Sequence, residues 1–330
     1  MLTEVDLGDV IDLGEHKTPR AHDAFLAAAI VDIDEWLTAE LPAAFGADWT
    51  PLDGDIWAGY PDSESPLPGC GEPETRYRDL ADYAAFYCEF GDFMVYDDGS
   101  DGLIVALADD LGPVVLGVVF AHEFGHAVQQ RAGVLDEGHA TVVTEQQADC
   151  ISGAWVRRVY TGASPHLRVG DSDLRAGLVA MVEVRDPVGI DQFGSGGHGT
   201  AFDRVGAFQL GFSADLAACA DLADHLLTLM PNVFQPGSLD ELRGGNAPYD
   251  CADEPVELQQ DCEPAPTFLA ADLNDYWDTV QPGFAALTPV PVTDFARFSC
   301  PDEVRLFDAI SYCPRDEGIA YDEPYVVDLY

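Results

Sequence analysis

Basic side chains are scarce in this chain of 330 residues. It carries 15 Lys and Arg residues against 60 Asp and Glu residues, Lys17 is its only lysine, and its formal net charge is −45. A field of this sign repels phosphate backbones and anionic lipid headgroups, which excludes nucleic acids and anionic membrane surfaces as partners. We interpret the acidity mainly as a solvated surface suited to a salty exterior. Calcium binding is the alternative, although Asp97, Asp98 and Asp101 form only a loose cluster.

Long apolar runs are absent as well. The run from Leu111 to Phe120 is too short for a membrane span, and two aspartates precede it, so we expect no transmembrane segment. The hydrophobic content of 47% is nevertheless that of an ordinary globular protein. A chain of this length can hold one large or two medium domains.

No CxxC pair occurs among the eight cysteines, which favours disulfides over a metal cluster. Disulfides imply an oxidising compartment. The first residues, Met1 to Asp6, lack the basic and apolar regions of a signal peptide. Either a signal peptide was removed ahead of this numbering or the thiols are free. We expect the former, and therefore a secreted protein or one on the exterior of the cell envelope.

What the sequence does contain is the pentapeptide HExxH, at His122-Glu123-Phe124-Gly125-His126. Residues four apart lie on one face of a helix, so both imidazoles can reach a single ion. Glu123 lies about 100° round the helix, beside a water on that ion without being a ligand. This arrangement predicts a zinc site in which His122 and His126 are ligands and Glu123 is the general base.

A second motif, ExxAD, follows at Glu145-Gln146-Gln147-Ala148-Asp149. A catalytic zinc needs a third protein ligand and an open position, and Glu145 is the candidate for that ligand. Asp149, one turn later, can accept the second N–H of a ligand histidine and fix its tautomer. Cys150 lies about 140° from Glu145 around the helix, so we expect it in a disulfide instead of at the metal.

The surroundings of both motifs predict helices. The first helix runs from about Leu111 to Arg131, with Pro113 in its first turn and Gly133 as its stop signal. A capping box of Thr144 and Gln147 predicts that the second begins beside Glu145 and ends near Tyr160. Gly125, between the histidines, is expected to allow close approach of another helix or of a substrate backbone.

These motifs resemble a known family. HEFGHAVQ followed by TEQQADCISGAW is similar to the bacterial neutral zinc metallopeptidases, within the gluzincin group that includes thermolysin. His198 to Arg204, HGTAFDR, resembles that family's later HGTxxQR segment, with Asp203 where the family usually has Gln. The resemblance extends over roughly residues 75 to 220. It implies the same roles: His122, His126 and Glu145 as zinc ligands and Glu123 as general base.

The function expected from these residues is zinc-dependent endopeptidase activity on peptide or protein substrates through a zinc-activated water. The tetrahedral oxyanion needs a second donor besides zinc, either His198, after a glycine-rich loop, or Tyr160, and His198 is preferred. The strand Phe93 to Tyr96 is expected to pair with an extended substrate. The alternative is a secreted binding or scaffold module with a structural zinc. That site would be closed by four protein ligands, and three are evident.

A weak internal repeat divides the chain. Tyr87-Cys88 followed by Tyr96-Asp97 matches Tyr312-Cys313 followed by Tyr321-Asp322, and the stretch DIDEW at 32–36 matches DLNDYW at 272–277. We therefore expect a zinc metallopeptidase unit at 1–236, a disulfide-containing linker at 237–266, and the start of a second, incomplete and non-catalytic copy at 267–330. The repeat predicts the pairs Cys70–Cys88 and Cys300–Cys313, which leaves Cys251–Cys262 and Cys150–Cys219.

The remaining pattern predicts an α+β fold, a mostly helical zincin-like unit with a small antiparallel sheet. A hairpin is expected around Gly91-Asp92, from Tyr83 to Cys88 and from Phe93 to Tyr96, and residues 46–82 are expected to form long loops. Further helices are expected at Ala21 to Leu41, at Leu174 to Val184, and after Thr200, where Phe202, Val205, Phe208 and Phe212 form an apolar stripe.

Overall fold

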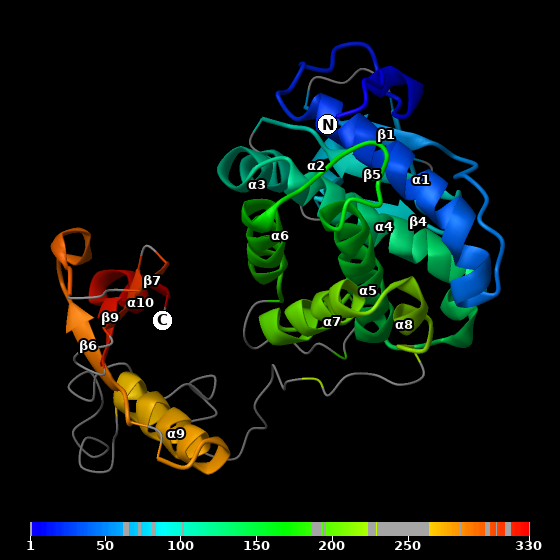
Figure 1. Cartoon of the computed structure of the whole chain (residues 1–330). Coiled ribbons are helices and arrows are strands. Elements are labelled where there is room, and N and C mark those ends of the chain that lie inside the picture. The colour runs from blue at the N-terminus through cyan, green and yellow to red at the C-terminus, as the bar shows by residue number, and fades with distance from the viewer. Residues whose placement is uncertain are drawn as a thin grey trace. The chain divides into compact units, whose positions relative to one another are not determined.

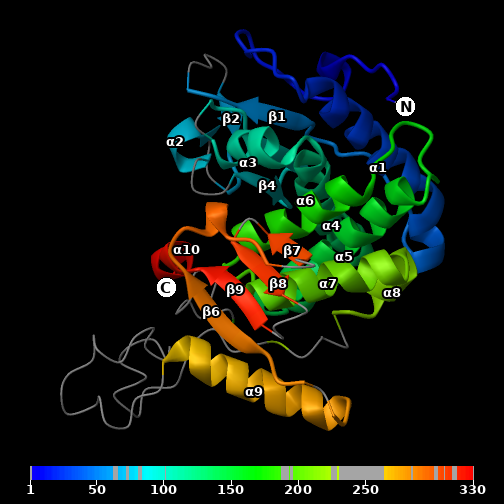
Figure 2. The same cartoon turned by 60° about the vertical axis from the view of Figure 1, so that its left-hand side comes forward.

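The computed structural model (Figures 1 and 2) describes residues 2–61, 66–71, 74–80, 84–100, 102–186, 193, 196–223, 229, 264–283, 285–300, 304–307, 309–313 and 318–329. The chain divides into two compact units, Met1–Val233 and Phe234–Tyr330. Most of the predicted linker at 237–266, including Cys251 and Cys262, lies outside the described residues.

A long helix opens the core of the first unit. Helix α1 spans Asp23–Phe45 and buries Ile33, Trp36 and Leu37. It continues past the predicted end at Leu41 because Pro42 is accommodated inside it, and it stops at Gly46, which adopts the left-handed conformation. Helix α1 packs against α4, the helix that carries the HExxH motif.

Three helices form the centre of the first unit, namely α4 (Val114–Ala132), α5 (Thr141–Tyr160) and α7 (Ala201–Ser213). Helix α4 ends at the left-handed Gly133, as predicted, but it begins at Val114 and not at Leu111, because Leu111 is the last residue of the preceding helix and Pro113 is the N-cap. Helix α5 begins at Thr141, a turn earlier than predicted, and the predicted capping box of Thr144 and Gln147 does not form. The Thr144 hydroxyl donates to the carbonyl of Thr141 inside the helix, and the Gln147 amide donates to the carbonyls of Cys219 and Ala220.

Glycines set the spacing between these helices. A Cβ atom at Gly125 of α4 would lie 2.9 Å from the Cα atom of Ala148 in α5, so the two backbones are in close contact there. Gly153 of α5 and Gly211 of α7 allow the same approach on the other side of α5, where each would clash with backbone of the facing helix if it carried a side chain. The role predicted for Gly125 is confirmed.

A small mixed sheet flanks α4. Its order is β1 (Ile56–Gly59), β5 (Phe93–Asp97), β4 (Ala85–Cys88), with β1 parallel and β4 antiparallel to β5. The hairpin of β4 and β5 is confirmed. Strand β1 lies where loops were expected, together with the short elements β2 (Leu67–Pro68), β3 (Glu74–Thr75) and α2 (Tyr77–Leu80). The prolines, glycines and aspartates around β1 predict loops, and the partner of β1 is distant in sequence.

The remaining elements of the first unit complete the helical layer. Helix α7 has the predicted cap, since Thr200 and Asp203 form a capping box, and Phe208 is fully buried, but Phe202 is 76% exposed and not part of the core. The other elements are η1 (Leu7–Asp9), α3 (Leu103–Leu111), η2 (Val134–Glu137), α6 (Asp171–Glu183) and α8 (Leu216–Ala220).

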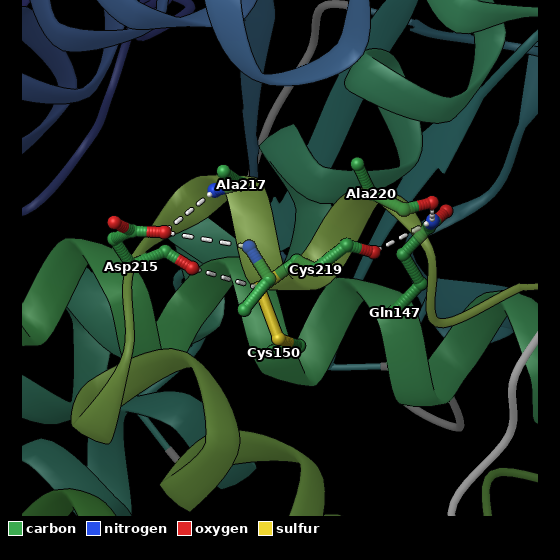
Figure 3. Close-up of a disulfide and its surroundings, with 7 residues drawn as sticks. Gln147, Cys150, Asp215, Ala217, Cys219 and Ala220 are labelled. Carbon is green, nitrogen blue, oxygen red and sulfur yellow. Dashed lines mark hydrogen bonds between the residues drawn. A yellow bond between two sulfur atoms is a disulfide. The ribbon is translucent and has the colours of Figure 1, made fainter.

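Three of the four predicted disulfides are confirmed: Cys70–Cys88, Cys150–Cys219 and Cys300–Cys313. The second joins α5 to α8, as Figure 3 shows. Around it, the Gln147 amide meets the carbonyls of Cys219 and Ala220, and the Asp215 carboxylate caps α8 at Ala217. The helix that carries Glu145 is thereby fixed to its neighbour by a covalent bond.

The second unit contains its own sheet, in the order β6 (Thr288–Val292), β9 (Gly318–Asp322), β8 (Ile310–Cys313), β7 (Val304–Phe307). Strand β6 is parallel and β8 antiparallel to β9. Among the described residues, the sheet is accompanied by the helices α9 (Ala265–Val280), η5 (Phe295–Arg297) and α10 (Glu323–Leu329). The mixture of helices and small sheets confirms the α+β class. The expected antiparallel sheet is wrong, since the sheet of each unit also contains a parallel pair, β1 with β5 and β6 with β9. No helix among the described residues is long and apolar enough to cross a membrane.

Candidate metal site

Helices α4 and α5 bring three of the predicted residues together. The ligand atoms of His122, His126 and Glu145 all lie within 4.8 Å of one another. His122 Nε2 is 3.1 Å from Glu145 Oε2, and His126 Nε2 is 3.4 Å from Glu145 Oε1. Their side chains are 8%, 16% and 9% exposed, so the cluster is nearly closed to solvent. The close contact of Gly125 with Ala148 allows the two helices to approach this far.

The other nitrogen of each imidazole is already occupied. His122 Nδ1 lies 2.8 Å from Asp149 Oδ1, and His126 Nδ1 lies 2.9 Å from Gln129 Oε1. The amide nitrogen of Gln129 donates to the Thr144 carbonyl, which leaves its oxygen facing His126. Both acceptors require a proton on Nδ1, so each Nε2 directs its lone pair towards Glu145 in the neutral tautomer. This is the tautomer that binds a metal ion through Nε2.

The residues present fit a divalent metal ion. Glu145 Oε2 is buried, and although it is close to His122 Nε2 it receives no hydrogen bond of acceptable geometry from the described residues. A buried carboxylate oxygen without a donor is costly, and a cation would satisfy it. Two imidazole nitrogens and one carboxylate are a ligand set that zinc accepts, and one further position would remain for water or substrate.

The electrostatics of the cluster depend on its carboxylates. Burial opposes the charged form of His122, but Asp149 and Glu145 outweigh it and raise the pKa of His122 to about 10. Burial also opposes charge on His126, and Glu145 raises its pKa. Burial would raise the pKa of Glu145, yet His126 and His122 hold it well below its usual range. A divalent ion bound at the two Nε2 atoms would compete with the protons that these carboxylates favour on the imidazoles.

Glu123 lies on α4 beside His122 and is 8% exposed. No described residue donates a hydrogen bond to its carboxylate, and it is not part of the three-residue cluster. The structure thus shows a buried carboxylate directly after His122 in α4, and the role of Glu123 as general base belongs to the proposal below.

Asp149 is fully buried and contacts His122 as the sequence predicted. Sequence analysis assigned no role to Arg204, the other residue that contacts the Asp149 carboxylate. Arg204 of α7 donates from Nε to Asp149 Oδ2 at 2.9 Å and from Nη2 to Asp149 Oδ1 at 2.8 Å. It also missed Gln129, although the i, i+3 spacing from His126 offered a signal.

His198 lies in the segment before α7 and is half-exposed. Asp186, which the sequence analysis also missed, accepts hydrogen bonds from the backbone N–H groups of His198 and Gly199, and its other oxygen is 3.4 Å from His198 Nδ1. The carbonyl of His198 lies 3.5 Å from the amide nitrogen of Gln146, the residue after Glu145. The contact with Gln146 places the segment that contains His198 beside α5, the helix that carries Glu145.

Tyr160, the other candidate oxyanion donor, is not part of this site. It is the last residue of α5, 15 positions beyond Glu145, which corresponds to about 22 Å along a helix. Its hydroxyl donates to Asp171 instead. The substrate strand also needs correction. Strand β5, which includes Phe93 to Tyr96, is paired on both edges by β1 and β4, so it has no free edge for a peptide.

A second group with metal-ligating atoms, His22, Asp23 and Asp98, lies at the start of α1. Lys17 Nζ already lies 2.8 Å from Asp23 and 3.3 Å from Asp98, and its side chain is 5% exposed. Arg20 adds a second positive charge beside Asp98. The two carboxylates of this cluster are therefore neutralised by Lys17 and Arg20. Asp97 and Asp98, two members of the loose acidic cluster considered as the alternative calcium site, are both buried, and Asp97 accepts a hydrogen bond from Tyr77. Asp101 lies outside the described residues.

Comparison with known proteins gives relatives but no function. No family model matches the chain, and no solved structure matches it. Uncharacterized proteins of Mycobacterium bovis and Mycobacterium tuberculosis are each 30% identical to it over 183 residues. The match covers 47% of this chain and 60% of each relative, so the chain spans about 60% of the length of these proteins. What the chain does therefore has to be argued from its site.

Proposed function

We propose that this chain is a zinc-dependent endopeptidase of the gluzincin type. The observation that carries the proposal is the buried cluster of His122, His126 and Glu145, with both Nδ1 atoms held by acceptors and one carboxylate oxygen without a donor. Three protein ligands leave a coordination position open, which is the arrangement of catalytic zinc sites. The helix pair that presents these ligands beside a small sheet is consistent with a zincin-like unit.

In this proposal the ion, when bound, acts as a Lewis acid and lowers the pKa of a water towards roughly 7. Glu123 accepts the proton of the attacking water and passes it to the leaving amine. His198 donates a hydrogen bond to the carbonyl oxygen of the substrate as negative charge develops there, with Asp186 orienting its imidazole. An extended peptide would lie along β4, since β5 is fully paired and the backbone of Asp12 already bonds the outer edge of β1 at Ile56 and Ala58.

The disulfides support a location outside the reducing cytosol. Three are formed among the described residues, and two of them enclose elements of the first unit. Such bonds persist in oxidising compartments. We therefore propose that the protein acts as a secreted or cell-envelope enzyme on peptide or protein substrates.

The competing function is a binding or scaffold module with a structural zinc. A structural site is closed by four protein ligands. Among the described residues the cluster holds three, and Asp149 and Gln129 are engaged with the Nδ1 atoms. This count favours catalysis over a structural role.

The deciding experiment is hydrolysis of casein and of a peptide library by the oxidised, zinc-loaded chain. We expect cleavage that a chelator abolishes and added zinc restores. Glu123→Gln should keep the zinc and lose cleavage, while the control Glu137→Gln, at an exposed carboxylate paired with His139, should cleave as the parent does. A zinc-loaded chain that cleaves nothing in the library would leave the binding module as the better explanation.

A further inference from the structure

The buried carboxylate behind His122 is held by two hydrogen bonds from one arginine. Asp149 receives His122 Nδ1–H at Oδ1 and Arg204 at both oxygens, while Arg204 Nη1 donates to the carbonyl of Val184. The side chains of Asp149 and Arg204 are 0% and 5% exposed. The chain therefore contains a continuous buried row of contacts from α7, through α5, to a metal ligand on α4.

The paired geometry of the Arg204–Asp149 contact matters more for the orientation of His122 than the positive charge of Arg204 alone. A guanidinium that bonds both oxygens of a carboxylate fixes the plane of that carboxylate, which a single contact does not. With its plane fixed, Asp149 presents Oδ1 to His122 in one orientation, and the ring of His122 is fixed in turn. His126 has a neutral amide as its acceptor, so this device is confined to one of the two histidines.

Arg204 is itself rigidly mounted. Its backbone N–H bonds the carbonyl of Thr200 in the first turn of α7, and Thr200 and Asp203 close the capping box around that turn. Further along, Gly153 of α5 and Gly211 of α7 place the backbones of the two helices in close contact. The guanidinium therefore approaches Asp149 from a helix with a fixed position.

We propose that Arg204 is a positioning residue for the metal ligand His122 and acts through Asp149. Two residues of the segment 198–204 then contribute to the site. His198 is the proposed hydrogen-bond donor to the substrate, and Arg204 acts on the ligand His122 through Asp149. This inference rests on the metal site of the proposed function. Arg204 touches neither the ion nor the substrate, and its contribution is the affinity and geometry of metal binding.

The test is a double-mutant cycle on zinc affinity, measured by competition with a chromophoric chelator. Loss of a residue behind a metal ligand typically weakens metal affinity about 10- to 100-fold, so we expect that loss for Arg204→Gln and for Asp149→Asn. Because Arg204 acts through Asp149, the double variant should bind zinc about as well as Asp149→Asn alone. Arg157→Gln is the matched control. Arg157 also joins α5 to α7, by bonds to the carbonyls of Phe212 and Ser213, but does not contact Asp149.

Arg204→Lys provides a second variant that keeps the charge but cannot form the paired contact. It should bind zinc with intermediate affinity and alter the visible spectrum of the cobalt-substituted chain, and it replaces Arg204→Gln in the cycle if the latter does not fold. A parent chain that binds no zinc refutes the proposed function and this inference together. A parent that binds zinc, with an Arg204 variant equally tight or with losses that add in the double variant, overturns the role of Arg204 alone.

Discussion

The sheets of the two units share an arrangement of three strands, and the elements that follow these strands in the chain differ. In each, an outer strand runs parallel to the central strand, and the central strand forms an antiparallel hairpin with a strand that ends in a disulfide cysteine, Cys88 in one unit and Cys313 in the other. In the first unit the hairpin is followed by α3 and then by α4 and α5, which carry the cluster of His122, His126 and Glu145. In the second unit the hairpin is followed by α10.

The helices that precede the two sheets differ in how deeply their apolar side chains are buried. In α1, Ile33 and Leu37 are completely buried, whereas the matching Leu273 and Trp277 of α9 are 56% and 43% exposed. The sequence pattern is shared, and in the first unit α1 packs against α4. The metal-ligating side chains of the first unit thus come from α4 and α5 and not from α1 or the sheet, so the proposed chemistry would depend on those two helices.

The strongest test of this assignment is removal of a ligand. His122→Ala and His126→Ala should each lower the zinc content from close to one per chain to near zero, because two ligands of a three-ligand site hold zinc poorly. Elemental analysis measures the effect. Full zinc retention by both variants, or a second equivalent of zinc in the second unit, would break the comparison.

The next effect is catalytic. Glu123→Gln should retain zinc and lose peptide hydrolysis by several orders of magnitude, as expected when the base that activates a water is removed. Single-turnover assays on the zinc-loaded variant measure the rate. Cleavage at the parental rate would show that Glu123 has another role.

A smaller effect separates the disulfides of the two units. Removing Cys150–Cys219 by paired Cys→Ala changes should cost roughly 2–4 kcal/mol of unfolding free energy. This bond closes a separation of 69 residues beside Glu145, so zinc affinity should fall with it. The Cys300–Cys313 bond closes 13 residues, and its removal should leave zinc affinity unchanged. Denaturant titration and chelator competition on both variants make the comparison, and equal losses of zinc affinity would contradict it.

The smallest expected effect is on the pH dependence of stability, through Asp92, which contacts Arg131 at the end of α4. Burial would raise the pKa of Asp92, but hydrogen bonds from Arg131 and Tyr87 outweigh burial and lower the pKa below the ordinary value of 3.8. A lowered pKa stabilises the fold above that value, and the contribution disappears as pH falls through the folded-state pKa. Asp92→Asn should therefore lower the melting temperature slightly at neutral pH, and the difference from the parent should vanish in strong acid. A difference that grows on acidification would refute this reading.

The parts of the site that the sequence predicted are local in the chain. Two histidines four residues apart share a helix face by geometry alone, and Gly125 between them signalled the close contact. The pairs Cys70–Cys88 and Cys300–Cys313 followed from the repeated hairpin. Strand β1 was missed because the prolines, glycines and aspartates around it predict loops, and because its partner, β5, is more than 30 residues away.

The residues behind the ligands required the folded chain. Arg204 reaches Asp149 across 55 residues, and nothing in the sequence between them specifies that contact. Asp186 similarly binds the backbone of a loop 12 residues later. The start of α5 was also misplaced, because Gln147 has the right spacing for a capping box yet donates its amide to the end of α8 instead. Tertiary partners of this kind override local signals.

The enclosed position of Lys17 has a practical consequence. The side-chain amine of the only lysine is held between two carboxylates at the start of α1, so amine-reactive dyes should not modify any side-chain amine while that region stays closed. Labelling at Lys17 would then report local opening of this segment. The chain thus carries a single built-in chemical probe of how often the segment before α1 opens locally.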